Sequence, residues 1–131
     1  MFISPSLIIA ESLNRGRGVF AIKKIAANTV IEISPVLVFP TKEVEFAEKT
    51  LLYNYFFEWG RNRKKRALGM GYISMYNHSY NSNCDYEMDY SDCIITITTV
   101  KAIAIGEELF INYNANPTDI TPEWFDKGNI S

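Results

Sequence analysis

The feature that most constrains the fold is the division of the chain into short β-prone segments separated by turn-forming residues. The longest segment, Val30–Phe39, is rich in Val, Ile and Phe and carries Glu32 and Ser34 in alternation, which predicts a strand with an edge or interruption at Pro35. Further strands are predicted at 19–22, 53–59, 67–76, 84–88, 94–101 and 109–113. Many short strands favour a mostly β fold with short helices.

The connections between these segments carry their own signals. Thr41 is the expected N-cap of one short helix from 42 to about 52. Residues 60–66 are polar and basic and predict a hairpin loop, whereas residues 77–83 predict a loop rich in turn formers. Strands 84–88 and 94–101 are expected to form a hairpin, across which Cys84 and Cys93 could face each other as free thiols.

Length and composition limit the class of protein. The 131 residues predict a single domain, and 47% apolar with 21% charged residues exclude a disordered or collagen-like chain. The apolar runs are far shorter than the roughly 18 residues of a membrane helix, so no membrane association is expected. The first ten residues lack the basic start of a signal peptide. We therefore expect a cytoplasmic protein, or a nuclear one in a eukaryotic host, and not a secreted one.

Charge and aromatic residues are unevenly distributed. The net charge of −2 argues against general nucleic-acid binding. Up to Cys84 there are 11 basic and 6 acidic residues, whereas from Asp85 onward there are 2 basic and 9 acidic ones. The acidic C-terminal third could attract a basic partner or could be a solvated face with no partner. Ten of the 18 aromatic residues lie between Tyr53 and Tyr90, which indicates an aromatic-lined core or cleft.

Several common kinds of site are excluded by residue type and spacing. The chain has one histidine and two cysteines, too few for a zinc site, so no metal is expected. It has no Gly-x-Ser-x-Gly nucleophile elbow. Gly16 and Gly18 lack the third glycine of a dinucleotide-binding turn and precede a predicted strand. Glu107 and Glu108 are adjacent on a turn and are expected to point apart, which argues against an acid/base pair.

Three segments are unusual for residues that only pack: RGRGVFA at 15–21, NHSYNSNC at 77–84 and GEELFINY at 106–113. In this order they resemble the SET-domain protein lysine methyltransferases. The first resembles the family's Gly-x-Gly cofactor turn, the second its Asn-His-Ser segment, and the third its Gly-Glu-Glu-Leu run ending in the catalytic tyrosine. The resemblance covers nearly the whole chain and is nearest to the minimal bacterial and viral members. It departs from the usual pattern at Ser82, Asn112 and Ile73.

The resemblance implies both a fold and an activity. The fold would be a SET-domain β-clip with a threaded C-terminal pseudoknot, in which the segment 106–113 passes beneath a loop near 77–79. A single SET domain would span 1–131, with a core at about 4–116 and a C-terminal lid segment at 117–131. The activity would be methyl transfer from S-adenosylmethionine to the side-chain amine of a lysine in a protein or peptide substrate. That substrate is expected to be basic, and minimal members of the family can form homodimers.

The resemblance also assigns roles to individual residues. Tyr113 would be catalytic, as an orienting and polarising hydroxyl. Cofactor-binding roles fall on Gly16, Arg17, Gly18, Asn77, His78 and Trp124. Candidates for the lysine channel are Tyr55, Phe56, Ile111 and Tyr53, since aromatic faces tolerate methylammonium groups. Because Ile111 stands where the family has an aromatic that restricts product multiplicity, di- or trimethylation is expected.

Other interpretations remain open at this stage. Each candidate residue could instead have an ordinary role in the core or in a turn. The same fold could serve as a catalytically weak module that binds a basic peptide or the cofactor. The basic loop at 61–66 could dock a polyanion, although a solvated hairpin loop explains it as well.

Overall fold

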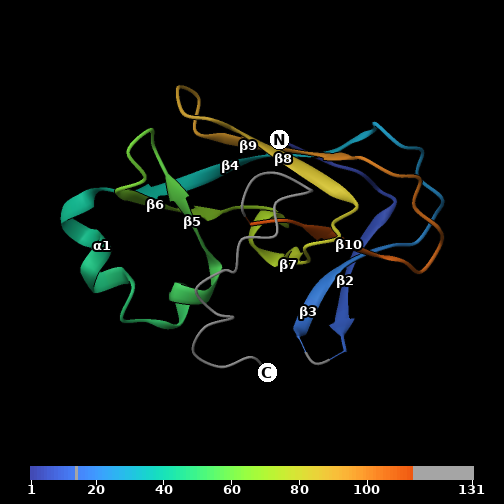
Figure 1. Ribbon diagram of the computed structural model, residues 1–131, viewed down its shortest axis with the longest axis horizontal. Coiled ribbons are helices and arrows are strands. Elements are labelled where there is room, and N and C mark those ends of the chain that lie inside the picture. Colours follow the sequence, from blue (N-terminus) through green and yellow to red (C-terminus); the bar gives the residue numbers. More distant parts are fainter. Residues whose placement is uncertain (14, 114–131) are drawn as a thin grey trace.

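The computed structural model describes residues 1–13 and 15–113, and these form two curved β-sheets with little helix. The larger sheet has the strand order β5-β6-β4-β9-β8, and β1 pairs with β4 beside this path. Its strands are β1 (Phe2–Ile3), β4 (Val30–Phe39), β5 (Phe56–Trp59), β6 (Lys65–Gly69), β8 (Cys84–Asp89) and β9 (Ile94–Thr99). Helix α1 (Thr41–Ala47) lies at one end of this sheet (Figure 1).

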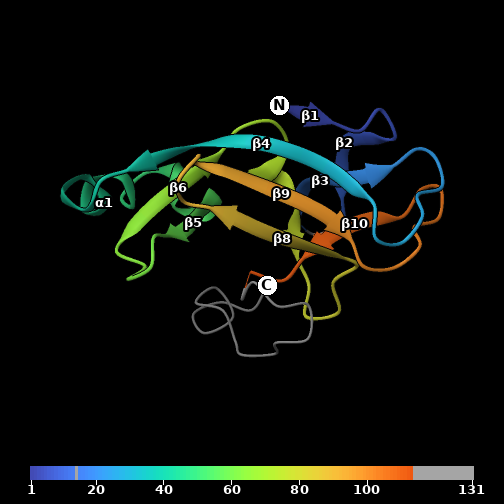
Figure 2. The same cartoon turned by 90° about the horizontal axis from the view of Figure 1, so that it is seen from above.

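The smaller sheet has the order β2-β3-β10-β7 and joins segments that are far apart in the sequence. Its strands are β2 (Leu7–Ser12), β3 (Gly16–Ala21), β7 (Asn77–His78) and β10 (Glu108–Ile111). Strand β10 lies between β3, with which it runs antiparallel, and β7, with which it runs parallel. In Figure 2 this sheet lies at the end of the molecule opposite α1. The expected contact between the segment 106–113 and the segment near 77–79 is confirmed.

The alternation of apolar and polar residues explains how the larger sheet forms its core. Strand β9 alternates half-buried with fully buried positions, and the side chains of Ile95 and Ile97 are fully enclosed. Strand β4 lies in the middle of the sheet and pairs with both β6 and β9. The core spans both sheets, since Val19 and Leu109 of the smaller sheet belong to the same buried cluster. The predicted mostly β fold and the strand at 30–39 are confirmed.

The predicted helix at 42 to about 52 is wrong in its extent. Helix α1 ends at Ala47 and its N-cap is Pro40 rather than Thr41. A separate 3-10 helix, η1 (Leu51–Tyr55), follows, and the Thr50 hydroxyl caps it by accepting a hydrogen bond from the Leu52 N–H. The predicted strand at 53–59 is therefore wrong for its first three residues. The aromatic residues favour a strand, but the hydrogen bond to the Thr50 hydroxyl starts a 3-10 helix here instead.

Three other sequence-based expectations are also corrected. The predicted strand at 67–76 ends at Gly69, because the chain turns at Gly71 (φ 56°) and continues as the 3-10 helix η2 (Ile73–Met75). The first two residues of the predicted loop at 77–83 form β7. Cys84 pairs with Thr99 in the β8–β9 register, whereas Cys93 lies at the other end of that hairpin, so the cysteines do not face each other. Both are free thiols, as expected.

Strands β1 and β2 were not predicted. The segment Leu7–Ser12 mixes Ile and Leu with Ala, Glu and Ser, and only its pairing with β3 makes it a strand. Among the described residues, no helix is long and apolar enough to cross a membrane.

Candidate active site

A groove of about 280 Å³ lies where the smaller sheet meets the η1 and η2 segments. It is lined by Arg15, Gly16, Arg17, Asn54, Tyr55, Ser74, Met75, Asn77 and Tyr113. Five residues that the sequence predicted for the site therefore meet in one place: Gly16, Arg17, Tyr55, Asn77 and Tyr113. They come from four regions separated by tens of residues, so their convergence is a result of the fold.

Tyr113 lies two residues after the end of β10, and hydrogen bonds hold both its backbone and its hydroxyl. Its backbone N–H donates to His78 Nδ1 at 3.0 Å, and its hydroxyl donates to the Tyr76 carbonyl oxygen at 2.9 Å. Its own carbonyl oxygen accepts from the Tyr86 hydroxyl at 2.9 Å. Its ring lies 5.0 Å from the His78 ring and 6.1 Å from the Phe57 ring, measured between centroids. The position and direction of the Tyr113 hydroxyl are thereby fixed.

His78 is a buried residue whose Nδ1 accepts a backbone hydrogen bond. Its carbonyl oxygen accepts from Arg15 Nη1 at 2.8 Å, and its ring packs against Tyr80 with centroids 4.3 Å apart. His78 does not line the groove, so its side chain serves to orient Tyr113 rather than to face a ligand there. Its expected roles, in binding the cofactor and not as a general base, stay predictions.

Asn77 and Gly18 meet at the junction of the four strands of the smaller sheet. Asn77 Nδ2 donates to Glu108 Oε2 at 2.8 Å and to the Arg17 carbonyl at 3.1 Å. Glu108 Oε1 accepts from Ser12 Oγ at 2.6 Å, so one carboxylate joins β2, β7 and β10. A Cβ at Gly18 would lie 2.7 Å from Asn77 Nδ2 and closer still to Glu108, so a larger residue at this position would displace these hydrogen-bonded side chains.

Glu107 and Glu108 point to different partners, as expected from their position on a turn. Glu107 accepts from Asn83 Nδ2 at 3.1 Å and from the Ala104 N–H at 2.9 Å, while Glu108 faces Ser12 and Asn77. Each carboxylate is structural, and each anchors a part of the chain that forms the site. They do not form an acid/base pair.

Arg15 is a residue of the site that was not singled out from the sequence. It lines the groove, donates to the His78 carbonyl and stands over the Phe110 ring with its guanidinium carbon 5.2 Å from the ring centroid. Its only sequence signal was its place at the start of the RGRGVFA segment. Arg15 and Arg17 together give the groove two cationic side chains, which suits a ligand that carries a carboxylate.

The other predicted channel residues lie outside the groove. Phe56 packs edge-on against Phe39 with centroids 5.2 Å apart, and Tyr53 is 38% exposed on η1. Ile111 is fully buried in the core, so its effect on the number of methyl groups stays a prediction. Gly18 also lies behind the groove lining, where it supports Asn77. Trp124 and the predicted lid at 117–131 fall outside the described residues.

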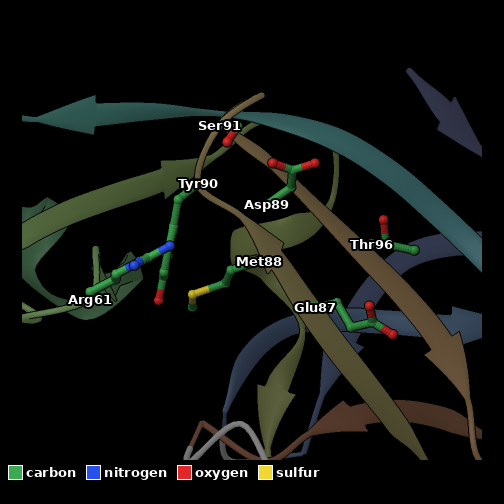
Figure 3. Close-up of a pocket in the computed structure, with 7 residues that line it drawn as sticks. All are labelled: Arg61, Glu87, Met88, Asp89, Tyr90, Ser91 and Thr96. Carbon is green, nitrogen blue, oxygen red and sulfur yellow. The ribbon is translucent and has the colours of Figure 1, made fainter.

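A second hollow, of about 440 Å³, is formed on the β8–β9 hairpin and shares no residue with the groove. Figure 3 shows Glu87 and Asp89 of β8 beside Thr96 of β9, with Arg61 reaching toward Tyr90. In the described part of the chain, no group of three or more His, Cys, Asp or Glu residues could hold a metal ion.

Comparison with known proteins identifies the family. The family model of the SET domain matches residues 16–114. Apart from Arg15, this range contains all residues of the three motifs and of the groove. The chain belongs to the SET-domain family. It is 39% identical over 112 residues to a histone-lysine N-methyltransferase of Schizosaccharomyces pombe specific for H3 lysine-37, across 85% of this chain and 75% of that protein.

Solved structures of SET-domain proteins share the fold. A Plasmodium falciparum protein assigned as a histone methyltransferase matches with a TM-score of 0.65 and 25% identity, over 85% of this chain and 95% of that one. Polycomb Repressive Complex 2 of Chaetomium thermophilum, bound to S-adenosylmethionine, matches with a TM-score of 0.71 and 22% identity, over 88% of this chain and 16% of that one. The predicted family, fold, enzyme class and S-adenosylmethionine-dependent lysine methylation are confirmed.

Proposed function

We propose that the groove binds S-adenosylmethionine and that Tyr113 directs the transfer of its methyl group to a lysine of a protein substrate. The observation that carries this proposal is the convergence of the fixed Tyr113 hydroxyl with Gly16, Arg17 and Asn77 in one groove. The groove residues fit the cofactor, because the cationic side chains of Arg15 and Arg17 match its carboxylate. No metal is needed for this reaction.

Positioning is the main contribution of the protein to this chemistry. The cofactor supplies a methyl group on a positively charged sulfur, and the lysine nitrogen must approach that carbon in line with the carbon–sulfur bond. Transfer forms the carbon–nitrogen bond while the electrons of the broken bond stay on sulfur, and the nitrogen loses a proton to solvent. Holding the amine in line removes much of the entropic part of the barrier.

Tyr113 is suited to orient the amine. Its hydroxyl proton points at the Tyr76 carbonyl, so its oxygen lone pairs are left to accept a hydrogen bond from the amine. Neutral amine at pH 7 costs about 4.6 kcal/mol for an ordinary lysine of pKa about 10.4. The positive charge of the nearby sulfonium disfavours the ammonium form and so lowers this cost.

The substrate that we propose is a lysine in a basic segment such as a histone tail. The S. pombe relative is named for a histone lysine, and the acidic residues from Asp85 onward would attract a basic peptide. The free thiols of Cys84 and Cys93 suit a reducing compartment, so we place the protein in the cytoplasm or a nucleus. We also propose that the protein forms a homodimer. We propose that it contacts neither nucleic acid nor a membrane directly.

Methyl transfer from radiolabelled S-adenosylmethionine to histones and to an array of lysine peptides tests this function. We expect transfer by the wild type, loss of at least about 100-fold in kcat for Tyr113→Phe, and cofactor binding within about threefold of wild type by calorimetry. Tyr90→Phe, which removes a hydroxyl on the distant β8–β9 hairpin, is the matched control and should retain full activity. Cofactor binding with no transfer to any substrate would favour a binding module instead.

A further inference from the structure

Glu32 is a fully buried carboxylate in the middle of the larger sheet. Its Oε1 accepts a hydrogen bond from the Tyr76 hydroxyl at 2.8 Å. Its Oε2 accepts from Ser34 Oγ at 2.7 Å and from the Tyr72 backbone N–H at 2.8 Å. Burying a carboxylate is costly, and a hydrophobic residue of similar volume would often stabilise the fold equally well. Its presence calls for an explanation other than packing.

The surroundings of Glu32 are built around the carboxylate. A Cβ at Gly71 would lie 2.5 Å from Glu32 Oε2 and 2.6 Å from Ser34 Oγ, so the chain approaches the carboxylate as closely as a glycine permits. Burial raises the pKa of Glu32, while hydrogen bonds from Ser34, Tyr72 and Tyr76 act to lower it. Burial and the neighbouring Glu32 charge hold the pKa of Tyr76 well above its usual range, so Tyr76 remains a hydrogen-bond donor.

Tyr76 connects this carboxylate to the active site. Its side chain is almost fully buried and ends at Glu32, while its backbone carbonyl accepts the Tyr113 hydroxyl at 2.9 Å. The residues on either side of it, Met75 and Asn77, both line the groove. The same residue is therefore anchored in the larger sheet through its hydroxyl and orients the Tyr113 hydroxyl through its carbonyl.

We propose that Glu32 is a positioning residue for methyl transfer, because it holds Tyr76 in the one place from which its carbonyl directs the Tyr113 hydroxyl. This proposal rests on the proposed function, which makes the direction of that hydroxyl important. Glu32 does not line the groove, and its contact with the residue that orients Tyr113 is the hydrogen bond from the Tyr76 hydroxyl. Without the anchor, the segment that carries Tyr76 keeps its sequence but loses its fixed position relative to Tyr113.

Two substitutions act on this anchor from opposite sides. Tyr76→Phe keeps the ring and the backbone carbonyl and deletes only the hydroxyl. Glu32→Gln keeps the shape, removes the charge and replaces one of the two acceptor oxygens by an NH2 group, which weakens the anchor. We expect Tyr76→Phe to lower kcat about tenfold and Glu32→Gln to lower it by less, while the KM for S-adenosylmethionine changes by less than about twofold in each. Because both act on the same hydrogen bond, the double variant should be no slower than the slower single variant.

A matched control separates positioning from loss of stability. Ile97→Val truncates a fully buried side chain of the same sheet and should lower the melting temperature while leaving kcat unchanged. Equal losses of kcat in Ile97→Val and Tyr76→Phe would overturn the proposal, as would wild-type kcat in Tyr76→Phe. If Glu32→Gln does not fold, Tyr76→Phe alone decides the outcome.

A spectroscopic readout keeps the proposal independent of turnover. In protein labelled with ¹³C at the tyrosine Cζ, the Tyr113 resonance should shift or broaden in Tyr76→Phe and in Glu32→Gln but not in Ile97→Val. An unmoved Tyr113 resonance in both anchor variants would refute the positioning role. If the wild type transfers no methyl group to any substrate, the proposed function fails, and the resonance still shows whether Glu32 orients Tyr113.

Discussion

The two sheets of the molecule differ in how they are assembled and in what they contribute. The larger sheet contains two hairpins of neighbouring strands, β5–β6 and β8–β9, and encloses side chains such as Ile95 and Ile97. The smaller sheet brings together β3, β7 and β10, which are separated by more than 50 and by about 30 residues in the sequence. Its strands carry or precede the groove residues Arg17, Asn77 and Tyr113.

We infer from this difference that the larger sheet mainly determines the stability of the fold and that the smaller sheet mainly determines the geometry of the candidate site. Apolar burial in the larger sheet is non-directional and tolerates small changes of shape, whereas the smaller sheet is held at its strand junction by directed hydrogen bonds to Glu108. Substitutions in the larger sheet should therefore mainly change the free energy of unfolding. Substitutions at the junction should mainly change cofactor binding and turnover. Glu32 is the exception, since it belongs to the larger sheet and reaches the site through Tyr76.

The largest effect on stability is expected in the larger sheet. Ile97→Ala removes a fully buried side chain from β9 and should lower the free energy of unfolding by about 2–5 kcal/mol. Chemical denaturation measures this loss, and kcat should remain at the wild-type value at temperatures where the variant is folded. A large fall in kcat of the folded variant would break the separation between the two sheets.

A smaller but more specific effect is expected at the strand junction. Gly18→Val would drive a side chain into Glu108 and Asn77, so S-adenosylmethionine should bind at least about 100-fold more weakly, or about 2.7 kcal/mol, by calorimetry. Gly106→Ala is the control, because it has positive φ and open space around it and so loses stability through backbone strain without touching the junction. Similar affinity losses in both variants would contradict a specific role for the junction.

The smallest effect at neutral pH concerns Cys84, which lies where the larger sheet meets the end of the smaller one. Burial, followed by the nearby charges of Glu107 and Asp85, raises the pKa of the Cys84 thiol to about 12. Because the unfolded chain loses this proton at lower pH than the folded one, the stability contributed by the neutral thiol is lost as pH rises above about 9.

Comparison of the wild type with Cys84→Ala isolates the contribution of the Cys84 thiol to the pH dependence of the unfolding free energy. The stability advantage of the wild type over the variant should shrink by about 1.4 kcal/mol per pH unit between about pH 9 and pH 12. Denaturation curves of the two proteins at matched pH measure the difference. A constant difference in unfolding free energy across this range would contradict the raised pKa and would show that water reaches Cys84 between the two sheets.

The sequence predicted the larger sheet better than the smaller one, for a physical reason. The strand at 30–39 and the β8–β9 hairpin are encoded by local alternation and by turn residues between neighbouring segments. The end of the helix and the residues 53–55 were misassigned, because the Thr50 cap that starts η1 does not stand out in the sequence from the aromatic residues that follow it. Strand β2 was missed because it depends on a partner strand rather than on its own pattern.

The sequence motifs identified residues of the candidate site only where those residues belong to a pattern typical of the family. Tyr113, Asn77, Gly16 and Arg17 were found through the three segments that resemble the family, and the fold confirms that they meet. The anchor at Glu32 gave no such signal, and Arg15 gave only its place at the start of the first segment, because their roles depend on contacts with residues more than 40 positions away. Long-range contacts of this kind cannot be deduced from spacing along one chain.

The most direct test of the account compares the methyl transfer rates of Tyr113→Phe and the wild type. The substrate is a lysine peptide that the wild type methylates, and mass spectrometry measures its methylation. The account predicts that the wild type adds methyl groups to one lysine. It predicts that Tyr113→Phe, with cofactor affinity within about threefold, loses at least about 100-fold in kcat. Methylation by Tyr113→Phe at the wild-type rate would contradict the central claim.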